Sequence, residues 1–125
     1  MATGNFILDK GYAPAVALTK FRAVKFSAEE TVTPVTAKTD VVAGVVQFDV
    51  ATGEITKGKL ASVRVEGASE MEASGTCTVG ALCGLTANGT VHDAVTGDRV
   101  IGTFRQGAAS GAFASVQLGL PGNII

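Results

Sequence analysis

Short stretches of alternating apolar and polar residues recur along the chain, at positions 46–50, 61–66 and 114–118. Successive side chains of a strand point to opposite faces, so this alternation predicts half-buried antiparallel strands. In residues 21–26 both sets of alternate positions mix apolar with basic side chains, and the pattern leaves open which face is buried.

Turn-forming residues separate these stretches, at positions 9–11, 51–54, 65–67, 87–90 and 96–98. The pair Asn88-Gly89 favours a tight hairpin, because both turn positions must tolerate a positive φ. The one helical candidate is a single turn at residues 27–30, which Pro34 soon follows. Closely spaced short strands predict an all-β fold, a small antiparallel β-barrel or sandwich.

The two ends of the chain differ from its middle. The first thirteen residues hold Phe6, Ile7, Leu8 and Tyr12 without a clear alternation. We therefore expect residues 1–13 to form an extended N-terminal arm and residues 14–125 to form a single β domain. The apolar pair at positions 124–125 either folds back on its own domain or lies on a neighbouring subunit.

Composition narrows the class of protein. A chain of 125 residues fits one domain, and 46% hydrophobic with 17% charged residues is too apolar for a disordered chain. The low share of charged residues also favours a surface that is covered by a partner, although a small Ala-rich domain without a partner would have the same composition. The net charge of −1 and scattered basic residues argue against nucleic acid, and no stretch is long enough to span a membrane. The first residues lack the pattern of a signal peptide, so we expect a cytoplasmic origin.

The sequence contains no complete catalytic motif. Residues 53–60 approach a phosphate-binding loop, but Leu60 replaces the hydroxyl residue that holds magnesium, and the pattern that follows is that of a strand. His92 and Asp93 are adjacent, so on a strand they point to opposite faces. Cys77 and Cys83 lie too far apart in sequence for a redox pair or zinc knuckle, which favours buried free thiols over a disulfide. We expect no enzyme activity, no cofactor and no metal.

Two long segments resemble the capsid decoration, or head cement, proteins of tailed bacteriophages. NFILDKGY and the stretch ALTKFRAVKF to EASGT resemble the N-terminal arm and first strands of that family. The segment VGALCGLTANGTVHDAVTGDRVIGTF, with the Gly-Ala loop and apolar strand after it, resembles the closing half. The two cysteines and the final GLPGNII have no counterpart that we can identify in the family.

This resemblance implies a protein made in the bacterial host cytoplasm that binds the outer surface of the assembled phage head. Its partner would be the major capsid protein, and it would form a homotrimer on the capsid and stabilise it against internal DNA pressure. The expected capsid-binding residues are Asn5, Phe6, Ile7, Leu8 and Tyr12. The alternatives are another virion β-module, such as a tail-tube or head-completion protein, and a small ligand-binding barrel.

Overall fold

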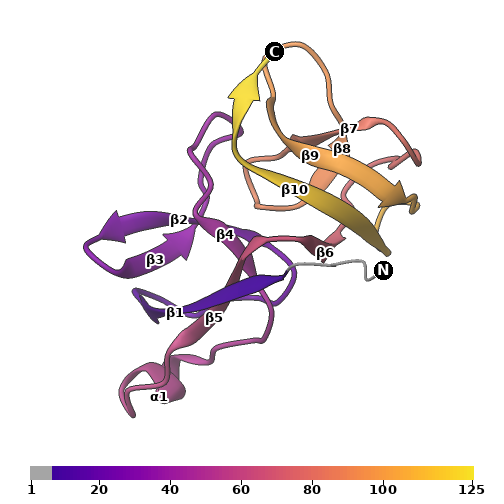
Figure 1. The fold of residues 1–125 in the computed structure, drawn as a ribbon. Coiled ribbons are helices and arrows are strands. Elements are labelled where there is room, and N and C mark those ends of the chain that lie inside the picture. Colours follow the sequence, from indigo (N-terminus) through magenta and orange to yellow (C-terminus); the bar gives the residue numbers. More distant parts are fainter. Residues whose placement is uncertain (1–6) are drawn as a thin grey trace, which may run out of the picture.

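The computed structural model describes residues 7–125, apart from the side chain at position 121, and consists almost entirely of β-strands (Figure 1). The elements are β1 (Leu8–Pro14), β2 (Ala23–Ala28), β3 (Thr31–Pro34), β4 (Gly44–Val46), α1 (Thr52–Ile55), β5 (Ala61–Glu66), β6 (Ala68–Glu72), β7 (Leu82–Leu85), β8 (Val91–Asp93), β9 (Arg99–Gln106) and β10 (Phe113–Ile124). In this part of the chain no helix has the length and apolar character needed to cross a membrane.

The strands form two units that follow each other in sequence. The first is a closed barrel in the order β1-β3-β2-β4-β5, and the second is a five-stranded sheet in the order β6-β10-β9-β7-β8. Figure 1 shows the barrel at lower left and the second sheet at upper right, joined where β5 runs into β6. The prediction of an all-β fold with a small barrel is confirmed; one barrel pair, β1 with β3, is parallel.

The prediction of an N-terminal arm is wrong for residues 8–13, because these residues belong to the barrel. Strand β1 pairs antiparallel with β5 over five positions and closes the barrel. Arg64 donates from Nε to Asp9 Oδ1 at 2.8 Å, and Tyr12 is only 7% exposed. The sequence did not indicate this strand, because β1 exposes four of its seven residues and has almost no apolar alternation.

Two other local expectations are also corrected. Residues 27–30 do not form a helical turn: residues 27 and 28 end strand β2, and residues 29 and 30 form the tight turn to β3, where Glu30 has a φ of 53°. The alternation at 46–50 ends with β4 at Val46, and Phe48 is 64% exposed. Gln47 is buried instead, because its Nε2 donates to Val45 O at 3.0 Å and to Ser69 Oγ at 2.9 Å. A contact with the second sheet thus overrides the local pattern.

The expected strands at 61–66 and 114–118 are confirmed as β5 and as part of β10. The Asn88-Gly89 hairpin is confirmed as the turn between β7 and β8, with Gly89 at a φ of 80°, although Asn88 does not adopt the positive φ that a two-residue turn would need. The only helix that the structure describes, α1, has four residues and precedes a turn and strand β5, so residues 53–60 do not form a phosphate-binding loop.

The hydrophobic core has two clusters. The barrel interior is filled mainly by small aliphatic side chains, namely Leu18, Val24, Val32, Val46, Val50, Ala61 and Val63, with Tyr12. The second cluster contains the larger Met71, Leu85, Ile101 and Phe104 of the second sheet together with Ala23, Val35, Val42 and Val45 from the barrel. The second sheet is therefore packed directly on the outside of the barrel.

Gly89 joins the two units at close range. Ala23 N donates to Gly89 O at 2.9 Å, and a Cβ at position 89 would lie 2.9 Å from Ala23 O. The backbone of the β7–β8 turn rests on β2 without an intervening side chain. Only glycine combines this approach with a positive φ.

We predict that Gly89→Ala lowers the free energy of unfolding by about 2 kcal/mol, from left-handed backbone strain and a displaced hydrogen bond. Urea unfolding measures the change. Gly53→Ala is the matched control: a Cβ there meets no atom within 4 Å and its φ is not positive, so its stability should be equal or slightly higher. Equal stability of the two variants would contradict the role assigned to Gly89.

Candidate functional site

The side chains that could take part in catalysis or metal binding make structural contacts instead. His92 Nε2 lies 2.8 Å from Asp98 Oδ2, whereas Asp93 accepts hydrogen bonds from Thr78 N at 2.8 Å and Thr78 Oγ1 at 2.6 Å. His92 and Asp93 thus have different partners, as their adjacent positions on a strand predict. Within residues 7–125, no three His, Cys, Asp or Glu side chains gather in a way that could hold a metal ion.

Asp98 is the most buried charged residue of this region, at 1% exposure. Burial by itself raises the pKa of this carboxyl group, but hydrogen bonds from Val95 N and His92 and the charge of Lys38 outweigh it, so the pKa is lowered. Lys38 Nζ lies 3.7 Å from Asp98 Oδ1 and comes from the loop between β3 and β4. Asp98 therefore ties the second sheet to a barrel loop.

Both cysteines are free and buried, which confirms the expectation from their spacing. Burial raises the pKa of Cys77 and, with contributions from Cys77 and Asp93, raises that of Cys83 strongly. Such thiols stay protonated at neutral pH and make poor nucleophiles.

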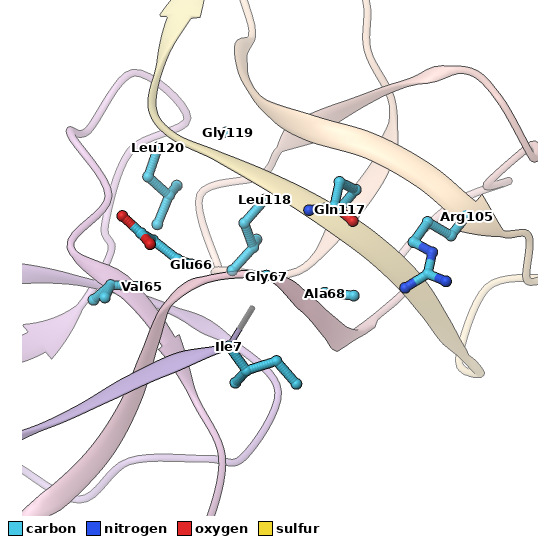
Figure 2. Close-up of a pocket in the computed structure, with 10 residues that line it drawn as sticks. All are labelled: Ile7, Val65, Glu66, Gly67, Ala68, Arg105, Gln117, Leu118, Gly119 and Leu120. Atoms are coloured by element: carbon cyan, nitrogen blue, oxygen red, sulfur yellow. The ribbon is translucent and has the colours of Figure 1, made fainter. Parts of the chain in front are cut away.

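A pocket of about 520 Å³ lies where the barrel meets the second sheet (Figure 2). Its walls come from the start of β1, the β5–β6 junction, β9 and β10. The lining residues are Ile7, Val65, Glu66, Gly67, Ala68, Arg105, Gln117, Leu118, Gly119 and Leu120.

The pocket exists because the chain bends sharply between the two units. Gly67 has a φ of 96° between β5 and β6, and its carbonyl accepts a hydrogen bond from Leu118 N at 2.9 Å. Beyond Leu118 the β10 register is interrupted until Asn123, which moves residues 119–122 out of the regular ladder. In Figure 2, Glu66 and Arg105 lie on opposite sides of the pocket, with Leu118 and Gln117 between them. A lining that carries opposite charges with apolar and polar side chains between them suits a peptide segment or protein surface better than a small anion or metal.

The five residues expected to contact a capsid are placed differently from one another. Asn5 and Phe6 lie outside the described residues. Ile7 is 47% exposed and lines the pocket, and Leu8 is half-buried at the start of β1. Tyr12 is buried in the barrel core and packs against Phe26 with ring centroids 5.1 Å apart, so its assignment as a contact residue is wrong.

The sequence reasoning missed the other pocket residues, since Arg105, Leu118 and Leu120 read as ordinary strand positions. The usable indication was the Gly119–Gly122 segment inside an apolar stretch, because glycine inside a strand often marks a bulge. An aromatic pair, half-buried Phe21 and exposed Phe113, was missed as well. Phe21, at a φ of 63°, packs edge-to-face on Phe113 with centroids 5.3 Å apart and joins the barrel to the second sheet.

Comparison with known proteins finds a solved structure with a similar fold. No protein-family model and no curated protein sequence matches the chain. Among solved structures, the chain is similar to "The crystal structure of head fiber gp8.5 N base in bacteriophage phi29", with a TM-score of 0.69 and 15% identity. The match covers 96% of this chain and 99% of that one, so it includes both the barrel and the second sheet. At this identity the likeness establishes a shared fold.

The Asp98 network predicts the response of the protein to acid. Because the pKa of Asp98 is lowered on folding from its ordinary value of 3.8, its contribution is fully present above about pH 5 and is lost as the pH falls through the folded pKa. At pH 7, Asp98→Asn should lower the free energy of unfolding by about 2–3 kcal/mol, since the charged hydrogen bonds are weakened.

Urea unfolding at pH 7 and at about pH 3 measures this difference. The difference in the free energy of unfolding between Asp98→Asn and the unchanged chain should be smaller at the lower pH. Glu29→Gln, an exposed residue in the β2–β3 turn, should match the unchanged chain at both pH values. A gap that stays constant between the two pH values would contradict the assignment.

Proposed function

We propose that this chain is a structural protein of a tailed-phage head that binds the outer surface of the assembled capsid and reinforces it. The observation that carries the proposal is the full-length fold likeness to a bacteriophage head fiber base. It agrees with the independent resemblance of the sequence to capsid decoration proteins. The proposed partner is the major capsid protein, and the proposed arrangement on the capsid is a homotrimer.

The architecture suits a protein under mechanical load. A closed barrel has no free strand edges, so it resists unwanted edge-to-edge pairing. Ion pairs and hydrogen bonds connect distant segments at several points. Arg22 Nη2 lies 3.2 Å from Glu72 Oε2 across the barrel–sheet boundary, and Arg99 Nη2 donates to Thr39 O at 2.9 Å. These contacts hold the second sheet in a fixed orientation on the barrel.

The pocket at the β5–β6 junction offers a surface for the capsid. Ile7 supplies exposed apolar area, and Arg105 supplies a positive charge on one side of the pocket. The Phe21–Phe113 pair lies on the same boundary between barrel and sheet, with Lys20 Nζ 5.6 Å from the Phe21 ring centroid. Aromatic and Arg side chains are enriched among residues that dominate interface energies. We assign the capsid contact to this boundary.

Two alternative functions would require a different assembly or a different barrel interior. A tail-tube or head-completion protein would assemble into rings without shells. A small-molecule barrel would need an open interior, but the barrel interior here is filled by buried side chains such as Val32 and Val63. We propose that the protein is not an enzyme, since His92, Asp98 and both cysteines serve the fold.

Co-sedimentation with phage shells tests the proposal. The unchanged chain should bind expanded capsids and not unexpanded precursors, because expansion creates the outer surface that it recognises. The double change Ile7→Asp and Arg105→Glu should weaken shell binding at least tenfold, about 1.4 kcal/mol, with little loss of thermal stability since both residues are exposed.

Phe48→Asp is the control, because Phe48 is 64% exposed and does not line the pocket. It should bind shells like the unchanged chain. Failure of the unchanged chain to bind expanded shells would overturn the proposed function, and equal loss in both variants would overturn the assignment to this boundary.

A further inference from the structure

Phe21 has a backbone conformation that a bulky side chain seldom adopts. It lies in the turn before β2 with a φ of 63°, where the Cβ of an ordinary residue comes too close to the next carbonyl oxygen. Glycine and asparagine are the residues that usually fill such a position. Within residues 7–125, Glu30 is the only other non-glycine residue with a positive φ.

The fold requires this conformation at position 21, but it does not require the phenyl ring. Phe21 N donates to Val46 O at 2.6 Å, and Glu72 N donates to Phe21 O at 3.0 Å, so both the barrel and the second sheet hold this peptide. These hydrogen bonds use backbone atoms alone and would remain with asparagine at position 21. Backbone strain that the surroundings hold in place is concentrated at functional sites, which points to a use for the ring outside the fold.

The ring of Phe21 is only partly used for packing within the chain. It is half-buried and meets Phe113 edge-to-face, while Phe113 is itself 46% exposed. The pair therefore keeps aromatic surface open to a partner. Such side chains, set beside a boundary that is already held in place, can bind with little further loss of conformational freedom.

The aromatic pair and the pocket at the β5–β6 junction lie on one continuous face of the second sheet. Phe113 and Gln117 are four residues apart on β10 and both are exposed, and the pairing of this segment with β6 has no bulge. Gln117 and its cross-strand partner Ala68 line the pocket. A partner seated on the pocket therefore reaches the aromatic pair by extending about 13 Å along β10.

Lys20 gives the surface beside Phe21 a positive charge. Its Nζ lies 5.6 Å from the Phe21 ring centroid, whereas the neighbouring Arg22 is paired with Glu72. Asp49 accepts a hydrogen bond from the backbone N of Lys20, and no carboxylate of the described residues lies within ion-pair distance of its Nζ. This arrangement suits a partner that places a carboxylate beside an apolar side chain.

We infer that Phe21 is the anchor residue of the capsid contact and that Lys20 binds an acidic side chain of the major capsid protein next to it. The left-handed turn presents the ring at the boundary between barrel and sheet, and binding rather than folding offsets the strain. This inference rests on the proposed function and names the partner chemistry at the same surface.

A matched pair of substitutions tests the anchor. Phe21→Asn removes the ring and tolerates the positive φ, and Glu30→Asn makes the same replacement at the other strained position. Co-sedimentation with expanded shells measures binding, and thermal unfolding measures stability. We expect Phe21→Asn to bind at least tenfold more weakly, with a melting temperature within about 5 °C of the unchanged chain, and Glu30→Asn to bind like the unchanged chain.

A second pair tests the acidic partner without altering the ring. Lys20→Glu should weaken shell binding at least about threefold at low ionic strength, and the loss should shrink in about 1 M salt because screening weakens exposed charge pairs. Lys57→Glu is the control, because Lys57 is exposed in the turn after α1. It should bind shells like the unchanged chain.

The inference is overturned if folded Phe21→Asn binds shells as well as Glu30→Asn, or if Lys20→Glu binds as well as Lys57→Glu. The second comparison decides the matter if Phe21→Asn does not fold. In each of these outcomes the unchanged chain still binds shells, so the proposed function stands. Failure of the unchanged chain to bind expanded shells would instead overturn the proposed function, and this anchor with it.

Discussion

Strand β4 and the first two residues of β2 are buried on both faces, and the rest of the structure depends on this constraint. Val24 and Val46 fill the barrel, while their neighbours Ala23 and Val45 face the second sheet. A barrel filled mainly with small aliphatic side chains contributes limited apolar burial, since each such side chain stabilises by about 1.5–3 kcal/mol at most. The second sheet supplies the larger side chains, including Met71 and Phe104, and covers the outside of the barrel. The barrel fills its own interior, whereas the core of the second sheet is completed by side chains from the outside of the barrel.

Polar contacts then fix how the second sheet lies on the barrel. Asp98 and Arg99 connect the beginning of β9 with the loop between β3 and β4, and Arg99 Nη1 also donates to Gly122 O at 3.0 Å. The same residues therefore position the β10 interruption that shapes the pocket. Apolar packing sets the layers, and this small set of hydrogen bonds sets their orientation. In a protein proposed to reinforce a shell, such a connection transmits load from one sheet to the other.

The functional surfaces follow from where the regular ladder of β10 is broken. A regular strand would have presented an even row of side chains at positions 118–123. The interruption instead opens one hollow at the boundary with the barrel and another that is lined by Gly102, Gly119 and Gly122. Both hollows are lined by residues of β10 and share Gly119, so a single interruption of one strand shapes two neighbouring surfaces.

The amino-acid sequence by itself determined the all-β class, the Asn88-Gly89 hairpin, strands such as β5 and the buried free thiols, because alternation, turn chemistry and cysteine spacing act over a few residues. Only the tertiary structure decided that residues 8–13 close the barrel, that Gln47 is buried while Phe48 is exposed, and where the hollows lie. Those outcomes depend on partners far along the chain: β5 for β1, Ser69 for Gln47, and β9 for the interrupted part of β10. Local patterning cannot encode such pairings, since the energy of a long-range contact exceeds the preference of any one position.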